Sequence, residues 1–302
     1  MKLNVLLLAT VIVLATSCKK EETTQAALTI TSADFSKNFK PGGATYNNAT
    51  INLAATPVTA PAAGENQTWD VSGLTLNTIT TFGPFLGPTN AAYPTSTFGS
   101  YVSTTFGFGA LTSAGTTAIQ YYEVNNDGWF TLGTATSTTD VLNIPSIGGT
   151  LTFAPQNIGA GSTKYPNINL PAAFGSKSST GNIVYNSNFI ANAPAVGVNN
   201  TPGQSRRTDS VSNNIFASGA ITLKGLGTYR VLVNKQTQVE KLNYFLGGAP
   251  APTPLLTLLG LTDGATTTTV GYSFYAEGLG IVGRINCDAT GTTVLNASFR
   301  VL

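Results

Sequence analysis

Residues 119–132 read IQYYEVNNDGWFTL and contain the clearest hairpin pattern in the chain. Two runs rich in aromatic and β-branched residues flank Asn125-Asn126-Asp127-Gly128, and an Asp-Gly pair tolerates the positive φ angles of tight hairpin turns. A calcium loop is the alternative for this cluster of Asn and Asp side chains, but the further alternating carboxylates that it requires are missing. The pattern therefore predicts a β-hairpin.

Further short strand candidates surround this hairpin, with turn residues between them, whereas helix-period runs are nearly absent from residue 28 onward. The sequence predicts an all-β fold over residues 28–302, either a β-sandwich or an open (half) β-barrel. One domain is expected, with two β subdomains dividing near 160–180 as the alternative. The predicted strands include 182–190, 220–223, 229–234, 238–246, 267–276, 280–287 and 294–302.

One segment departs from the strand pattern. Residues 247–261 read GGAPAPTPLLTLLGL, in which Thr253 can cap a short helix, Pro254 suits its first position and Gly260 lies near its end. We predict a short helix near 254–259 that closes one end of the core. The alternative is an exposed apolar lip that touches a lipid or a partner protein.

Composition excludes several classes of function. The 302 residues include no His, so Ser-His-Asp, Cys-His and His-metal catalysis are excluded, and no cofactor or metal is expected. A net charge of +2 argues against nucleic-acid binding. Alternation in 280–287 places Cys287 on the opposite face from Arg284 and directs the thiol into the core; a reactive nucleophile is the alternative.

The N-terminus has the features of a signal peptide. Lys2 is followed by a mostly apolar run, and Ala15-Thr16-Ser17-Cys18 ends in a cysteine. These residues resemble a bacterial lipobox, and the resemblance implies that residues 1–17 are removed and that Cys18 is lipidated. Two or three acyl chains would hold the protein at the membrane. A plain signal peptide or a short transmembrane anchor is the alternative.

The residues after Cys18 form a polar stretch, predicted to be a flexible tether over 18–27. Lys19, Lys20, Glu21 and Glu22 resemble the surface-export signal of Bacteroidetes lipoproteins, which implies display on the outer face of the outer membrane. A solvated linker with balanced charges is the other interpretation.

Two further stretches resemble uncharacterised Bacteroidetes surface proteins. GENQTWDVSGL at 64–74 is similar to a G-N-Q-T-W-D-F-S-L pattern near the start of such proteins. GTYRVLV at 227–233 with YSFYAEGLGIV at 272–282 resembles the G-T-Y/F … Y-A-x-G-x-G-x-V pattern of β-rich envelope proteins with open-barrel folds. The resemblance implies a surface protein family with no assigned activity, and it supplies no catalytic residues.

Two small motifs give candidate sites. Trp69 and Asp70 are a candidate sugar platform, because an aromatic face stacks on a pyranose and a carboxylate accepts its hydroxyl protons; a core Trp with a turn-holding Asp is the alternative. Asp209-Ser210-Val211 fits the Bacteroidetes O-glycosylation pattern, with Ser210 as the acceptor. The polar stretch 199–214 around it is predicted to be an exposed loop.

We therefore expect a noncatalytic, lipid-anchored binding or structural module whose partner is a glycan or a surface protein. A glycan-active enzyme with two carboxylates is one alternative, because it needs no His. Its candidate acids, most of them predicted to lie at exposed turns, are Asp70, Glu123, Asp127, Asp140 and Glu277. Acyl-chain carriage in an open barrel, with 255–261 as a lid, is another alternative.

Overall fold

The computed structural model describes residues 26–108, 111–159 and 163–302. Strands account for 62% of the described residues and helical residues for 6%, and the sheets are mainly antiparallel, with none closed into a barrel among these residues. The all-β prediction is confirmed, and the architecture is consistent with a sandwich or an open barrel. Among the described residues, no helix combines the length and apolar character needed to cross a bilayer.

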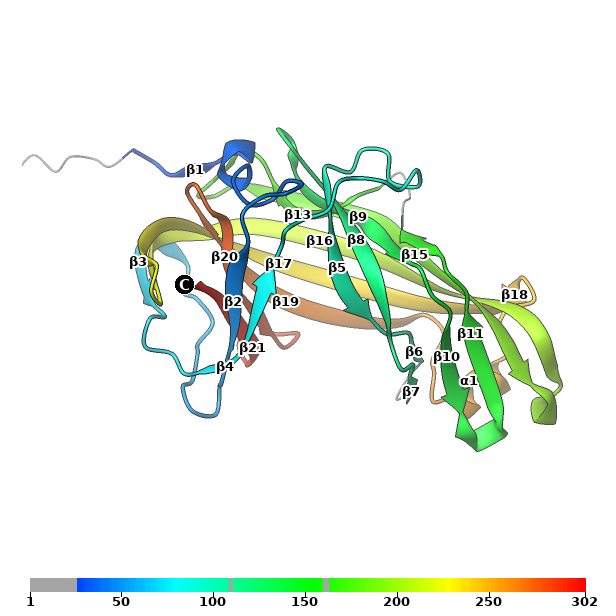
Figure 1. Ribbon diagram of the computed structural model, residues 1–302. Helices are drawn as coiled ribbons and strands as arrows, with labels where there is room; N and C mark the ends of the chain where they lie inside the picture. Colours follow the sequence, from blue (N-terminus) through cyan, green and yellow to red (C-terminus); the bar gives the residue numbers. More distant parts are fainter. Residues whose placement is uncertain (1–25, 109–110, 160–162) are drawn as a thin grey trace, which may run out of the picture.

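A 12-stranded sheet forms the larger layer, and its long central strands run the length of the molecule (Figure 1). Strands from both sides of residues 160–180 contribute to it. Its order is β10 (Asp140–Ile144), β11 (Gly149–Phe153), β15 (Lys177–Ala193), β16 (Val198–Leu223), β17 (Gly227–Leu246), β19 (Ala265–Ala276), β20 (Gly280–Cys287), β21 (Val294–Val301), β2 (Tyr46–Ile51) and β4 (Leu76–Phe82). β3 (Gly64–Asp70) pairs parallel with β16, and β18 (Ala249–Pro250) pairs with β17.

The central strands are longer than the sequence predicted. β15, β16 and β17 contain 17, 26 and 20 residues, and the predicted strands 229–234 and 238–246 are two parts of β17. The expected loop at 199–214 is wrong, because residues 203–214 pair with β17 and all of these except Ser210, at a bulge, also pair with β15. The reason is physical: here both faces of β16 carry polar side chains, so the usual apolar alternation is absent.

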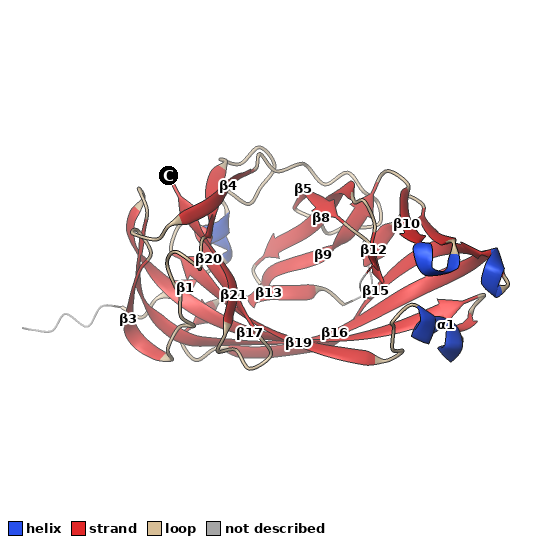
Figure 2. Cartoon of the chain, turned by 90° about the horizontal axis from the view of Figure 1, so that it is seen from below, coloured by secondary structure: helices blue, strands red, loops and turns tan. Residues whose placement is uncertain are grey.

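A smaller sheet of five strands lies within the curve of the large one (Figure 2). It contains β12 (Asn157–Gly159), β9 (Gly128–Thr136), β8 (Thr116–Asn125), β5 (Phe98–Thr104) and β13 (Tyr165–Asn169). The predicted hairpin is β8–β9, in which Asn125 pairs with Gly128. Asn126 and Asp127 form the turn, and Asn125 Oδ1 accepts hydrogen bonds from the backbone N–H groups of Asp127 and Gly128 at 2.8 and 3.1 Å.

The three largest of five apolar clusters among the described residues account for most of the core. One packs a face of β19, β20 and β21 against the segment 52–75, and Cys287 is buried in it, as predicted. A second joins the two sheets through Trp129 of β9, Leu232 of β17 and Tyr275 of β19. A third fills the end of the molecule near β10 and β11.

Short elements complete the fold. α1 (Thr253–Leu258) confirms the predicted helix to within one residue at each end, and its buried Leu256 closes the third cluster. Of the exposed apolar lip considered as the alternative, only Leu258 is exposed among the leucines of this segment, at 47%. The remaining elements are β1 (Thr29–Ile30) paired with β14 (Ala172–Ala173), β6 (Gly107–Phe108) paired with β7 (Leu111–Thr112), and the 3₁₀ turns η1 (Ser32–Phe35), η2 (Pro145–Ile147) and η3 (Pro194–Val196).

Candidate functional site between the two sheets

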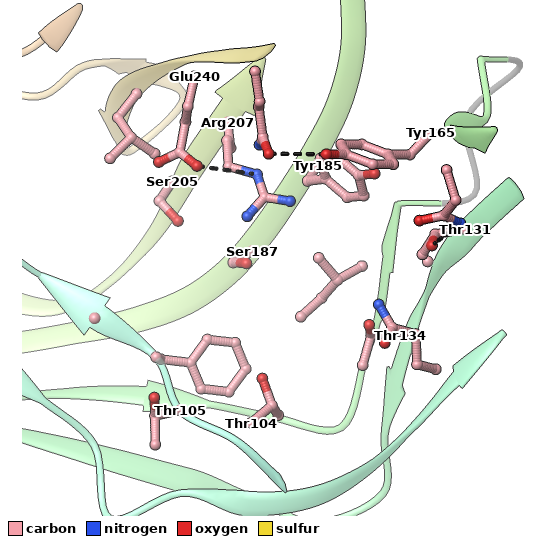
Figure 3. Close-up of a pocket in the computed structure, with 18 of the residues that line it drawn as sticks. Thr104, Thr105, Thr131, Thr134, Tyr165, Tyr185, Ser187, Ser205, Arg207 and Glu240 are labelled. Carbon is pink, nitrogen blue, oxygen red and sulfur yellow. Dashed lines mark hydrogen bonds and ion pairs between the residues drawn. The ribbon is translucent and has the colours of Figure 1, made fainter. Parts of the chain in front are cut away.

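A cavity of about 590 Å³ separates the small sheet from the middle of the large sheet. The large sheet contributes β15, β16, β17 and β20, and the opposite wall comes from β8, β9, β12, β13 and the segment 104–108. Figure 3 shows residues of both walls around this space. Hydroxyl, amide and charged side chains predominate on these walls, with aromatic rings among them. The polar lining consists of Thr104, Thr105, Gln120, Thr131, Thr134, Asn167, Ser187, Ser205, Arg207, Gln238, Glu240 and Arg284.

A second cavity of about 280 Å³ continues from the first toward β2 and β21. Gln120, Tyr122, Trp129 and Arg284 line both cavities, so the two are neighbouring parts of one space between the sheets. Its aromatic lining consists of Phe39, Tyr46, Phe82, Phe85, Phe98, Tyr122 and Trp129. The whole space therefore changes from mainly hydroxyl-lined to mainly aromatic along its length.

Arg207 of β16 connects two carboxylates on the large-sheet wall. Its Nε lies 3.4 Å from Oδ1 of Asp209 and 3.7 Å from Oε2 of Glu240, and its guanidinium lies 4.3 Å from the ring centre of Tyr185. The Asp209 side chain is 0% exposed, and its Oδ2 accepts a hydrogen bond from Gln238 Nε2 at 3.0 Å. Burial raises the pKa of Asp209 to about 6, although the charge of Arg207 lowers it.

Polar side chains of the large sheet hold β13 over this wall. Tyr165 Oη donates to the side-chain oxygens of Gln236 and Gln238, each at 2.9 Å. Gln236 and Asn213 also donate to the Pro166 carbonyl, at 2.9 and 3.3 Å. Because these groups are buried, each lost hydrogen bond would leave an unsatisfied polar atom. The network therefore fixes the distance between the sheets on this side of the cavity.

The sequence-predicted residues Trp69 and Asp70 lie away from this cavity. Trp69 packs edge-on against Phe274, with ring centres 5.3 Å apart, at the border of the cluster below the large sheet. Asp70 is exposed, and its Oδ1 accepts hydrogen bonds from Ser72 N and Oγ at 3.0 and 2.6 Å; these bonds lower the pKa of Asp70. The geometry matches the alternative interpretation, a packed Trp and an Asp that holds a turn.

The five acids proposed for a glycan-active enzyme are not brought together in the cavity, and none of them lines it. Asp127 and Glu277 are exposed at turns, and Glu277 Oε2 lies 3.6 Å from Arg230 Nη1. Glu123 and Asp140 are strand residues, each 5% exposed, and Glu123 lies in the first strand of the predicted hairpin. Lys164 Nζ lies 2.6 Å from Glu123 Oε2 and compensates its charge.

The remaining predicted sites separate into two groups. Ser210 is exposed, but it lies inside β16 and pairs with Val239 of β17 rather than belonging to a loop. Its glycosylation stays a prediction. Cys18 and the residues Lys19, Lys20, Glu21 and Glu22 lie outside the described residues, so lipidation and export also stay predictions.

A small apolar cavity of about 40 Å³ lies beside α1, and Leu255, Leu256, Leu259 and Leu261 of the segment considered as a lid line it. Acyl-chain carriage on the concave face of the fold, with this segment as a lid, stays a prediction. In the described part of the chain, no group of three or more Asp, Glu, His or Cys side chains is arranged to hold a metal ion.

The cavity residues were missed at the level of sequence because they come from strands distant in the chain. Arg207, Glu240 and Arg284 lie on β16, β17 and β20, and only Arg284 lies between two buried neighbours, Gly283 and Ile285, as a signal in its own strand. No protein-family model matches the chain, and neither a curated protein sequence nor a solved structure matches it. The functional argument therefore depends on the cavity itself.

Proposed function

We propose that this chain is a noncatalytic binding module that takes a hydroxyl-rich ligand, a glycan, into the cavity between its two sheets. The observation that carries the proposal is the lining of that cavity, in which hydroxyl and amide side chains alternate with the rings of Tyr122, Tyr165 and Tyr185. Aromatic faces pack against the C–H groups of sugar rings, while polar side chains exchange hydrogen bonds with the hydroxyls. A volume of about 590 Å³ lies within the range of ligand sites, roughly 300–1,000 Å³.

We also propose that the module binds its glycan without hydrolysing it. The two carboxylates nearest the cavity are Asp209 and Glu240, and a glycosidase would need both to reach the sugar. The Asp209 side chain is 0% exposed and already accepts a hydrogen bond from Gln238, so it has no access to a ligand. Glu240 alone cannot supply the acid and the base.

We further propose that a lipid on Cys18 anchors the module to the outer membrane and that the tether displays it on the cell surface. The lipobox-like residues and the acidic pair Glu21-Glu22 support this placement. A surface position would give the cavity access to extracellular glycans.

The experiment is a glycan-array screen of the full chain followed by calorimetric titration of the best neutral oligosaccharide. Ser205→Trp fills the cavity, whereas Ser212→Trp places the same side chain on the other face of β16, where Ser212 is exposed. We expect S205W to weaken binding at least tenfold and S212W to change it less than twofold. Absence of binding, unaltered binding by S205W, or a hydrolysed product by mass spectrometry would contradict the proposal.

A further inference from the structure

Two arginines on adjacent strands face the second cavity. Arg284 of β20 pairs directly with Ser298 of β21, and Arg300 lies two residues further along β21. Because alternate residues of a strand share a face, both side chains belong to the cavity side of the sheet. Arg284 lines both cavities, and Arg300 lines the second.

Both arginines bond to neutral acceptors. Arg284 Nε donates to Asn286 Oδ1 at 2.9 Å, and Arg300 Nη1 donates to the Leu279 carbonyl at 3.2 Å. The Arg300 guanidinium also lies 4.2 Å from the ring centre of Tyr46. Among the described residues, no carboxylate oxygen lies within 4.0 Å of either guanidinium. This contrasts with Arg207, which has two acidic neighbours.

Burial makes the uncompensated charge of Arg300 costly, whereas Arg284 beside it is exposed to the solvent of the cavity. Arg300 is only 6% exposed, and this burial lowers its pKa, although Tyr46 acts in the opposite direction. Two positive charges on one wall repel each other more strongly in a partly desolvated cavity than in water. None of the residues that line the second cavity is acidic. An anion bound between the sheets would remove this repulsion.

The geometry of the wall indicates which kind of anion fits. A guanidinium presents a planar fork of N–H donors that matches a carboxylate. Opposite the arginines, the rings of Phe98, Tyr122 and Trp129 provide apolar and aromatic surface for a ring-shaped body. The indole N–H of Trp129 is buried without a hydrogen-bond acceptor among the described residues, so this wall also contains an unused donor.

We propose that Arg284 and Arg300 form a carboxylate-binding subsite within the space between the two sheets. If the chain binds glycans as proposed above, the ligand of this subsite is an acidic sugar such as a uronic acid. The hydroxyl-lined cavity holds the neutral part of the ligand, and the arginine-lined cavity holds its carboxylate. The second cavity would therefore make the protein bind acidic glycans more tightly than neutral ones.

The test is calorimetric titration of the full chain with D-glucuronate, D-glucose and benzoate. We expect glucuronate to bind at least tenfold more tightly than glucose, and Arg284→Gln to remove that difference. Arg284→Lys keeps the charge but not the fork, and should lose less affinity than R284Q. Arg206→Gln is the matched control, because Arg206 is exposed and hydrogen-bonds to Asn186 and Gln204 outside either cavity. Thermal melts verify that each variant is folded.

The outcomes separate this inference from the proposed function. The subsite is overturned if glucuronate and glucose bind equally, or if folded R284Q still prefers glucuronate. In either case, binding of a neutral oligosaccharide that S205W weakens would still support the glycan-binding module. Conversely, R284-dependent binding of benzoate without binding of any sugar supports the subsite and contradicts the glycan ligand.

Discussion

The carboxyl group of Asp209 lies fully inside the protein, next to Arg207 and Gln238. Burial penalises the charged form and raises the pKa of Asp209 to about 6, despite the lowering effect of Arg207. In the unfolded chain this group has an ordinary pKa near ~3.9. Between these two values the native state binds more protons than the unfolded state, so Asp209 makes stability fall as the pH rises through this range.

Replacing the Asp209 carboxyl by an amide should change how the free energy of unfolding depends on pH. Asp209→Asn can keep an acceptor for Gln238 while removing the buried charge. Below about pH 4 the carboxyl is protonated in both states, and its ionisation contributes nothing. From about pH 4 to 6 the free energy of unfolding of the wild type should fall relative to D209N, by roughly 1–3 kcal/mol, and then stay level. Urea titrations at pH 4, 5, 6 and 7 measure this difference.

The control is Asp127→Asn, because Asp127 is exposed at the β8–β9 turn. Its stability difference from the wild type should not show this fall between pH 4 and 6. A difference between wild type and D209N that is constant over this range would show that Asp209 has an ordinary pKa in the folded state.

The parallel pair of β3 and β16 depends on a glycine. Gly219 pairs with Gln67, and a Cβ at position 219 would overlap the Gln67 backbone carbonyl. Gly219→Ala must therefore push β3 off the sheet or distort both strands. We expect G219A to lower the free energy of unfolding by about 2 kcal/mol or more, as overpacking against backbone does. Gly73→Ala is the control, because a Cβ there meets nothing within 4 Å.

Hydrogen exchange can show whether G219A destabilises β3 in particular. In G219A the amides of β3 should exchange faster than in the wild type, whereas those of β19 and β20 should keep their relative protection. G73A should leave both groups unchanged. An unchanged denaturation midpoint for G219A, with β3 still protected, would mean that the strands do not approach as closely as the structure shows.

Elements with one apolar face were predictable from sequence. β20 was predicted with its observed bounds, because its inward residues Ile285 and Cys287 alternate with Arg284 and Asn286. α1 was predicted from Pro254 and from the turn glycine Gly260, which has a φ of +67°. In both cases, local chemistry and burial favour the same structure.

β16 shows where this reasoning fails. Between residues 201 and 214, Arg207, Asp209 and Asn213 face the cavity or the polar network, while Ser210 and Ser212 face solvent. Such a segment has no apolar alternation and has the composition of a loop. It is a strand because β15 and β17 satisfy its backbone on both sides, which is information from distant parts of the sequence. The cavity residues were unpredictable for the same reason.

Charge is divided between the two layers of the molecule. The sequence contains no Lys or Arg between Lys40 and Lys164, and the five strands of the small sheet carry none. The cationic groups of the cavities, Arg207, Arg284 and Arg300, all belong to the large sheet. The cationic side chains of the cavities therefore all lie on the large-sheet wall, and the part of that wall without acids, around Arg284 and Arg300, favours ligands with an acidic edge.

Attachment to the membrane would determine where the whole molecule lies. It is predicted from residues 15–18, which lie outside the described ranges. We expect mass spectrometry of the mature protein to find Cys18 as an acylated N-terminal residue, because Ala15-Thr16-Ser17-Cys18 follows an apolar run. Cys18→Ala should leave the outer-membrane fraction, since two or three acyl chains supply the binding energy. An unmodified N-terminus upstream of residue 18, or membrane fractionation of C18A, would contradict lipidation.

Surface display is a separate prediction, because a lipid alone does not determine which side of the outer membrane the protein occupies. Lys20, Glu21 and Glu22 follow the predicted acylation site Cys18 after Lys19 and precede the first strand in the sequence, so replacing all three by Ala changes the proposed signal without changing the sequence of either sheet. An antibody against the folded body therefore recognises wild type and variant equally in lysed cells. On intact cells we expect strong labelling of the wild type and at least a tenfold weaker signal for the variant. Thr23, Thr24 and Gln25 replaced together by Ala form the matched control and should leave labelling unchanged. Equal labelling of all three proteins on intact cells would show that these charges are an ordinary solvated linker.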